Sequence, residues 1–332
     1  MTHSSVKFSG AGVFFIVMTL IGWSSVPLFL KHFAGFFDAW TANGWRYGIS
    51  ALFWSPVLII AARRGTLPQG LWKAAIVPSV VNCLGQNCFA WAPYYINPGM
   101  MTFILRFNII VIALGAYLIF PSERRILKSW SYWVGLALVL GGCAGVIFLG
   151  REVPNVTRAR GIALAIAGGF FFAFYSLSVR YYMTGFHPVS AFAAISVYTS
   201  VVLVAMMIPL SPDHGRAAMS LSAGQFALLA ASSLAGIALG HAFYYAGLAR
   251  LGVAVSSGIV LLQPVLASIG SYFIFDERLT TAQWAGGLGA ICGAMLILRA
   301  QHRLTQRERS RTAPELFATA PPAEPVIERI PE

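Results

Sequence analysis

Two long segments decide the fold, because they can be laid over each other: residues 86–130, QNCFAWAPYYINPGMMTFILRFNIIVIALGAYLIFPSERRILKSW, and residues 240–284, GHAFYYAGLARLGVAVSSGIVLLQPVLASIGSYFIFDERLTTAQW. The alignment pairs Phe89 with Phe243, Glu123 with Glu277, and Trp130 with Trp284. One repeat therefore has room for about five apolar helices of roughly 20 residues each. An odd number of spans per repeat places the two halves in opposite orientations, which is an inverted-repeat architecture.

The composition points to an integral membrane protein. Of the 332 residues 58% are hydrophobic and only 10% are charged, with a mean hydropathy of +0.72. A soluble globular chain carries about 25% charged residues. We predict an all-α membrane protein with ten transmembrane helices, at about 10–32, 39–61, 73–96, 99–120, 130–150, 160–182, 188–210, 223–248, 253–275 and 282–300.

These spans divide the chain into two five-helix repeats, residues 1–150 and 151–301. Residues 302–332 are rich in Pro, Ala, Glu and Arg and have too little apolar surface to fold alone, so we predict a disordered cytoplasmic tail. The first apolar run has no clear cleavage site, which favours an uncleaved first span.

The net charge of +12 follows from the membrane topology. Most of the 23 Lys and Arg residues lie in the segments that are cytoplasmic when the N-terminus is inside. We therefore expect a plasma (inner) membrane protein with both termini in the cytoplasm. The lipid bilayer and a small-molecule metabolite are the expected partners, without nucleic acid, and a homodimer stays open.

Several motifs in this order resemble the EamA-type members of the drug/metabolite transporter superfamily. They are GWSSVPLFLK and WRY in the first half, and GHAFYYAGLARLGVAVSSGIVLLQPVLASIGSYFIFDERLTTAQWAGG in the second. The resemblance covers about residues 10–300 and implies ten spans, inverted repeats, and a central cavity from which small metabolites are exported or exchanged. RFNII, beginning at Arg106, departs from the family's apolar fourth span, so an unusual substrate is expected.

Three arginines lie within predicted spans, Arg46, Arg106 and Arg180, and no Asp or Glu lies deep in any span. A charge at the bilayer centre costs about 2.5–3.5 kcal/mol on insertion scales, so such residues are functional candidates. Arg106 lies on the smaller, more polar face of its helix. It either anchors an anionic group of the substrate or bonds the protein's own carbonyl groups. Asn108 lies on another face and favours an interhelical hydrogen bond. Arg46 and Asn108 are secondary candidates.

Polar residues in other spans add to the site. Ser79, Asn82 and Gln86 recur on one face of the third span, either lining a cavity or packing against a helix. The repeat places this face opposite the eighth span. The predicted substrate-binding residues are Arg106, Asn82, Gln86, His241, Tyr244, Gln263 and Trp23, with Ser79 secondary. Pro27 and Pro264 are the predicted hinges.

Motifs for other chemistry are missing from the sequence. It has no Walker A motif, no G-x-S-x-G and no H-E-x-x-H, so we expect no enzyme, no cofactor and no metal. We predict a secondary transporter that exports or exchanges a small organic metabolite by alternating access, with an amino acid or related carboxylate favoured. Exchange ranks above proton coupling, for which His241 would be the only deep group. The alternatives are a sugar-phosphate or nucleotide-sugar antiporter, a lipid flippase, or a non-transporting membrane partner.

Overall fold

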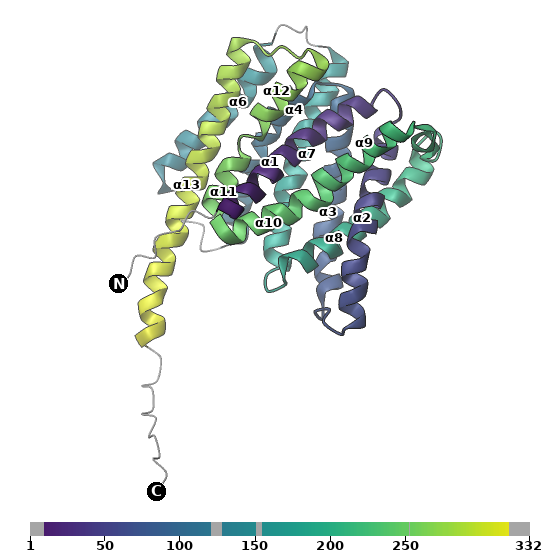
Figure 1. Cartoon of the computed structure of the whole chain (residues 1–332). Helices are drawn as coiled ribbons and strands as arrows, with labels where there is room; N and C mark the ends of the chain where they lie inside the picture. Colours follow the sequence, from purple (N-terminus) through teal and green to yellow (C-terminus); the bar gives the residue numbers. More distant parts are fainter. Residues whose placement is uncertain (1–9, 121–127, 151–154, 252, 319–332) are drawn as a thin grey trace.

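A computed structural model describes residues 10–120, 128–150, 155–251 and 253–318, and within these ranges it contains helices and no strand. The first half comprises α1 (Gly10–Phe33), α2 (Ala39–Arg63), α3 (Leu71–Trp91), α4 (Pro98–Ile104), α5 (Asn108–Ile119) and α6 (Trp130–Phe148). The second half comprises α7 (Val156–Tyr182), α8 (Pro188–Leu210), α9 (Ala223–Ser233), α10 (Leu239–Leu251), α11 (Val253–Val260), α12 (Gln263–Phe275) and α13 (Thr281–Ala318). Figure 1 shows them as one helical bundle.

Three predicted spans are built from more than one helix. The fourth span is α4 and α5 joined by a 3₁₀ turn, η2 (Leu105–Phe107), and the eighth is α9 and α10 joined by a π-helical segment, η5 (Leu234–Ala238). The ninth span is α11 and α12, with a break at Leu261 and Leu262 before Pro264 in the first turn of α12. Pro27 lies inside the continuous α1.

Hydropathy confirms the membrane fold. In the described residues nine segments are long and apolar enough to cross a membrane. The remaining predicted span, α3, is not among them although it has 21 residues, because Lys73, Asn82, Gln86 and Asn87 lower its hydropathy. With α3 included, the predicted arrangement of about ten spans is retained.

Polar caps and glycines fix where the helices begin and how closely they pack. The Asp38 carboxylate accepts the amide hydrogens of Trp40 and Thr41 at 2.8 and 3.1 Å, which begins α2. Along α6 and α13, which lie side by side in Figure 1, a Cβ added to Gly135 would lie 2.7 Å from the Gly293 carbonyl oxygen. These two helices can therefore approach each other only because both carry glycine there.

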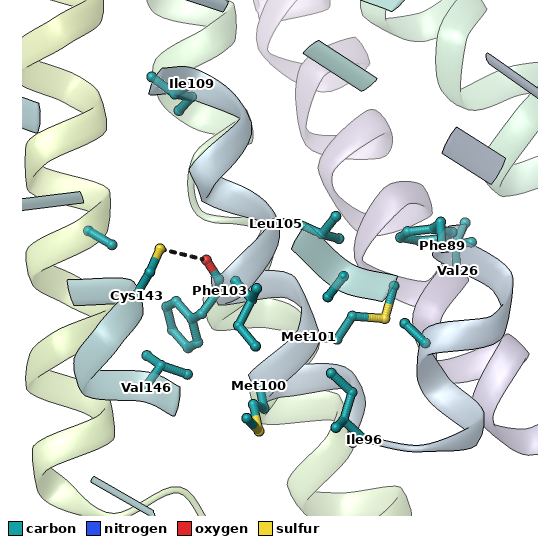
Figure 2. Packing of buried hydrophobic residues seen from close by; sticks show 14 of the residues in the cluster. Val26, Phe89, Ile96, Met100, Met101, Phe103, Leu105, Ile109, Cys143 and Val146 are labelled. Carbon is teal, nitrogen blue, oxygen red and sulfur yellow. Dashed lines mark hydrogen bonds between the residues drawn. The ribbon is translucent and has the colours of Figure 1, made fainter. Parts of the chain in front are cut away.

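The core is packed around α4. Figure 2 shows Phe103 pointing toward Cys143 and Val146 of α6, whereas Met101 points away, toward Phe89 of α3. The Cys143 thiol donates to the Phe103 carbonyl oxygen at 3.7 Å. Since Met101 and Phe103 are fully buried, α4 is held on both sides by apolar contacts.

The loop after α12 ties the second repeat to the start of α4. The Glu277 carboxylate accepts the amide hydrogens of Gly99 at 2.8 Å and of Met100 at 2.9 Å, and its side chain is 7% exposed. Asp276, with φ of 52°, makes the left-handed turn that places Glu277 there. A buried carboxylate at a helix N-terminus satisfies free N–H groups and complements the helix dipole.

The C-terminal end differs from the prediction of disorder from residue 302. Helix α13 continues from the last span to Ala318, and residues 319–332 lie outside the described part. The segment after residue 302 is rich in Gln, Arg and Glu, which are good helix formers, and it extends a helix already nucleated in the last span.

Candidate substrate cavity

A cavity of about 220 Å³ lies among the helices, and both repeats contribute to it. Its walls come from α1, α2, α3, the α4–α5 junction, α7, the α9–α10 segment and the start of α12. The lining residues are Trp23, Val26, Arg46, Tyr47, Asn82, Gln86, Phe89, Leu105, Arg106, Asn108, Phe172, Tyr175, Ser176, Gly236, Ile237, His241 and Gln263.

Arg106 enters this cavity from the 3₁₀ turn η2. Its Nη2 donates to the Gln263 side-chain oxygen at 2.6 Å, while its Nε is buried without a hydrogen-bond partner. The residue is 8% exposed. The hydrogen-bond partner of this guanidinium is thus a neutral amide, and part of its donor capacity is unused.

Gln263 connects Arg106 to α1. Its side-chain nitrogen donates to the Trp23 carbonyl oxygen at 3.0 Å, and its own carbonyl oxygen accepts the Ser24 hydroxyl at 3.3 Å. Gln263 is the first residue of α12, directly after the break in the ninth span. One amide therefore links the first, fourth and ninth spans at a point where the helix is interrupted.

Arg46 brings a second guanidinium to the same cavity from α2. It is 1% exposed, its Nε donates to the Ser232 hydroxyl at 2.8 Å, and its Nη1 is buried without a partner. The Ser233 hydroxyl also donates to the Arg46 carbonyl oxygen. A Cβ added to Gly236 would clash with Val26, so glycine lets the π-helical segment approach α1; the same Cβ would lie 3.6 Å from Arg46 Nη2, at ordinary contact distance.

Amide and aromatic groups form the other walls. Asn82 donates to the Thr199 hydroxyl at 3.1 Å, and Gln86 donates to the Asn82 oxygen at 3.5 Å. His241 Nδ1 lies 3.0 Å from the Ile237 carbonyl oxygen. The imidazole stacks on Phe192 with ring centroids 4.3 Å apart, and the Trp23 ring meets it edge-on at 5.1 Å.

The charge of the lining is one-sided. Among the lining residues there are two arginines and neither an aspartate nor a glutamate, as far as the described part of the chain extends. Burial removes the water that would otherwise solvate a guanidinium, so an anion entering the cavity gains more than it would at the surface. The arrangement can bind an anionic group and hydrogen-bond a polar remainder.

Most of the predicted site residues come together here. Trp23, Asn82, Gln86, Arg106, His241, Gln263 and the secondary candidates Arg46 and Asn108 all line the cavity. The structure places these side chains at the cavity wall, and their contact with a substrate stays a prediction.

Two predicted residues are not in the lining. The Tyr244 ring lies 5.1 Å from that of Trp23, so it supports a lining residue instead. The Ser79 hydroxyl donates to the carbonyl oxygens of Ala75 at 2.7 Å and Ile195 at 3.5 Å, because α8 packs closely against this turn of α3.

Asn108 lies on the cavity together with Arg106, whereas a continuous helix would place the two on different faces. The reason is the 3₁₀ turn at Leu105–Phe107, which has about 3.0 residues per turn and rotates the following residues relative to an α-helix. The Asn108 Oδ1 is buried without a partner, so among the described residues no interhelical hydrogen bond is donated to this oxygen.

The predicted site did not include several other lining residues, namely Tyr47, which belongs to the WRY motif, and Phe172, Tyr175 and Ser176 of α7. Helix α7 is aromatic on all sides around FFFAFYS, so periodicity does not reveal its inner face. Gly168 and Gly169 were an available signal: a Cβ on Gly169 would lie 3.3 Å from the Leu105 carbonyl oxygen, so glycine allows α7 to approach η2.

Comparison with known proteins assigns the family. A model of the EamA-like transporter family matches residues 10–148 and 159–299. None of the curated proteins matches the chain. One solved structure, described only as a crystal structure of a protein, shares 15% sequence identity and covers 88% of this chain and 98% of its own, with a TM-score of 0.58, which supports the fold. The chain is a member of the EamA-like transporter family, and hence a multi-pass membrane transporter of the drug/metabolite transporter superfamily.

Proposed function

We propose that this protein moves a small organic anion across the membrane by alternating access, and that Arg106 binds the anionic group. The observation that carries the proposal is the buried Arg106 guanidinium, which lines the cavity, hydrogen-bonds a neutral amide and has an unused donor. A guanidinium binds carboxylate or phosphate through two parallel hydrogen bonds. The anion would accept hydrogen bonds from Nη2, which now donates to Gln263, and from Nε, which has no partner.

The cavity size favours a small substrate. Pockets that bury drug-sized ligands measure roughly 300–1,000 Å³, and this one measures about 220 Å³. That volume suits an amino acid or related carboxylate better than a nucleotide-sugar. A sugar phosphate is the second candidate, because two arginines line one cavity. A lipid flippase or a non-transporting partner gains no support from this polar, charged lining.

The broken helices support alternating access. Transporters with inverted repeats bind substrate beside discontinuous helices and expose the site by rocking one bundle against the other. Here the fourth, eighth and ninth spans are interrupted next to Arg106, Gly236 and Gln263. Pro264 lies at the break in the ninth span, and Pro27 lies inside α1 next to the lining residue Val26. We propose these two prolines as hinge positions.

We further propose that the protein resides in the plasma (inner) membrane with both termini in the cytoplasm, since most Lys and Arg residues are then inside. Cysteines placed at Thr66 and at Ser220, both exposed and in loops on opposite predicted sides, would test this topology. An impermeant thiol reagent added to intact cells should label the position at 220 and spare the one at 66.

The transport proposal is tested with purified protein in vesicles loaded with candidate anions. Arg106→Gln should reduce flux at least tenfold, since it removes a charged hydrogen-bond donor worth about 1.5–3 kcal/mol. Arg63→Gln, which removes an exposed arginine at the end of α2, is the matched control and should transport normally. Unchanged flux in Arg106→Gln, with the protein folded, would reject Arg106 as the anchor.

A further inference from the structure

The second guanidinium of the cavity, that of Arg46, is not explained by an anion with a single negative charge. Arg46 is 1% exposed. Its Nε donates a hydrogen bond to the Ser232 hydroxyl, whereas its Nη1 is buried without a hydrogen-bond partner. A buried cation with unused donors loses its hydration without full replacement, which destabilises the charged form. Such a group needs an anion to compensate it.

No protein group in the described lining supplies that anion. The lining contains no carboxylate, and the hydrogen-bonded side chains of both arginines are neutral, a serine hydroxyl for Arg46 and a glutamine amide for Arg106. The two guanidiniums therefore repel each other across one cavity. A ligand with two negative charges would neutralise both at once.

The surroundings of Arg46 hold it in place. Ser232 and Ser233 are both fully buried, and each hydrogen-bonds Arg46, one to the guanidinium and one to the main-chain oxygen. Gly236 of the π-helical segment lines the cavity beside Arg46, and a Cβ added there would lie 3.6 Å from Nη2. Fixed donors at the wall of a cavity are what a preorganised anion subsite requires.

We infer that the substrate is a small organic dianion, with one negative group on Arg106 and the second on Arg46. This inference rests on the proposed function and narrows it to dicarboxylates and phosphate monoesters. Amides at Asn82, Gln86 and Asn108 remain for uncharged oxygens of the ligand. Among the small carboxylates that the cavity volume suits, the two arginines favour a dicarboxylate over a zwitterionic amino acid, whose ammonium group would find no carboxylate among the lining residues.

Matched ligands test the inference on the unaltered protein. Succinate and its monoamide succinamate have nearly the same size but carry two charges and one. A second pair, glycerol 3-phosphate and its methyl diester, makes the same comparison for phosphate. Dissociation constants would be measured by thermal shift in detergent, where a ligand of the native state raises the apparent stability.

In one pair or both, the dianion should bind about 10- to 100-fold more tightly than its single-charge partner, because one more charged hydrogen-bonded contact is made. The pair that responds identifies the dicarboxylate or the phosphate monoester. Equal affinities within both pairs would overturn the inference while leaving an anion anchored by Arg106 intact. Binding of neither anion in any pair would overturn the proposed function as well.

Variants assign the second charge to Arg46. Arg46→Gln should bring the dianion to the affinity of its single-charge partner and leave the partner's affinity unchanged, whereas Arg106→Gln should weaken both. Arg46→Lys keeps the charge and should retain part of the preference. If Arg46→Gln misfolds, Ser232→Ala removes the hydroxyl that fixes the guanidinium, and it should weaken binding of the dianion while leaving the affinity of its single-charge partner unchanged; an unchanged dianion affinity would reject Arg46 as the subsite. A folded Arg46→Gln that still prefers the dianion would reject Arg46 as the subsite.

Discussion

Replacing Glu277 by glutamine should weaken the attachment of the second repeat to α4. The carboxylate is 7% exposed and accepts the amide hydrogens of Gly99 and Met100 at 2.8 and 2.9 Å. Glutamine has nearly the same shape but only one acceptor oxygen, and its NH₂ group would face a backbone N–H. One hydrogen bond to a charged acceptor contributes about 1.5–3 kcal/mol, and the charge at the helix N-terminus about 0.3–1 kcal/mol. We expect a loss of about 2–4 kcal/mol in the free energy of unfolding.

The measurement is an unfolding titration in mixed micelles, followed by helix content. Asp276→Asn is the matched control, because it removes the same charge from the neighbouring residue. The Asp276 carboxylate is 74% exposed and pairs with Arg278 at the surface, and asparagine tolerates the left-handed conformation. Asp276→Asn should therefore unfold like the wild type. If Glu277→Gln is as stable as Asp276→Asn, the carboxylate does not hold α4, and the proposed role of the cap is wrong.

Three further outcomes are expected. Gly293→Leu should prevent α13 from packing on α6, because a Cβ there already meets Leu138 Cβ at 2.8 Å; loss of a monodisperse peak in size-exclusion chromatography would report it. The Ser211 hydroxyl, foremost among several donors, lowers the pKa of Asp213 in the loop after α8. Because the folded pKa is the lower one, this contribution is complete above about pH 4 and is lost as pH falls further; Asp213→Asn should flatten acid unfolding there, and an unchanged acid curve would contradict it. If transport is an exchange without proton coupling, the substrate flux into vesicles should be the same with and without a pH gradient. The flux of His241→Gln should likewise not depend on the gradient. A flux driven by the pH gradient would instead establish proton coupling.

The membrane fold could be predicted because apolar length and repeat similarity are properties of single segments. Residues 86–130 and 240–284 can be laid over each other without a gap, and most predicted spans begin and end within a few residues of the helices in the structure. The exceptions are local. The third span ends early at Trp91, before Pro93, and α13 runs past residue 302 to Ala318 because good helix formers follow an existing helix.

The polar residues that line the cavity could be predicted from the sequence, whereas most of its apolar residues could not. Arg46, Arg106 and Gln263 stand out in apolar spans, and burial of such groups demands partners, so they gather in one place. Asn108 lies at the cavity because of the 3₁₀ turn at Leu105–Phe107, and no residue type in RFN predicts such a turn. The aromatic wall of α7 was missed because aromatic residues on every side of a helix give no inner face.

Helix α3 has a consequence for how the protein enters the membrane. It falls outside the nine segments that hydropathy alone would select, and nine crossings would leave the two chain ends on opposite sides of the bilayer. Two of the polar groups responsible donate to partners late in the chain: Asn82 to Thr199 and Asn87 to the Met206 sulfur, both in α8, although Asn87 also accepts a hydrogen bond from Asn43 of α2. During synthesis α3 emerges before those partners exist. The topology of the first repeat is therefore completed only when the second repeat arrives, and a chain stopped after α6 should leave α3 poorly inserted.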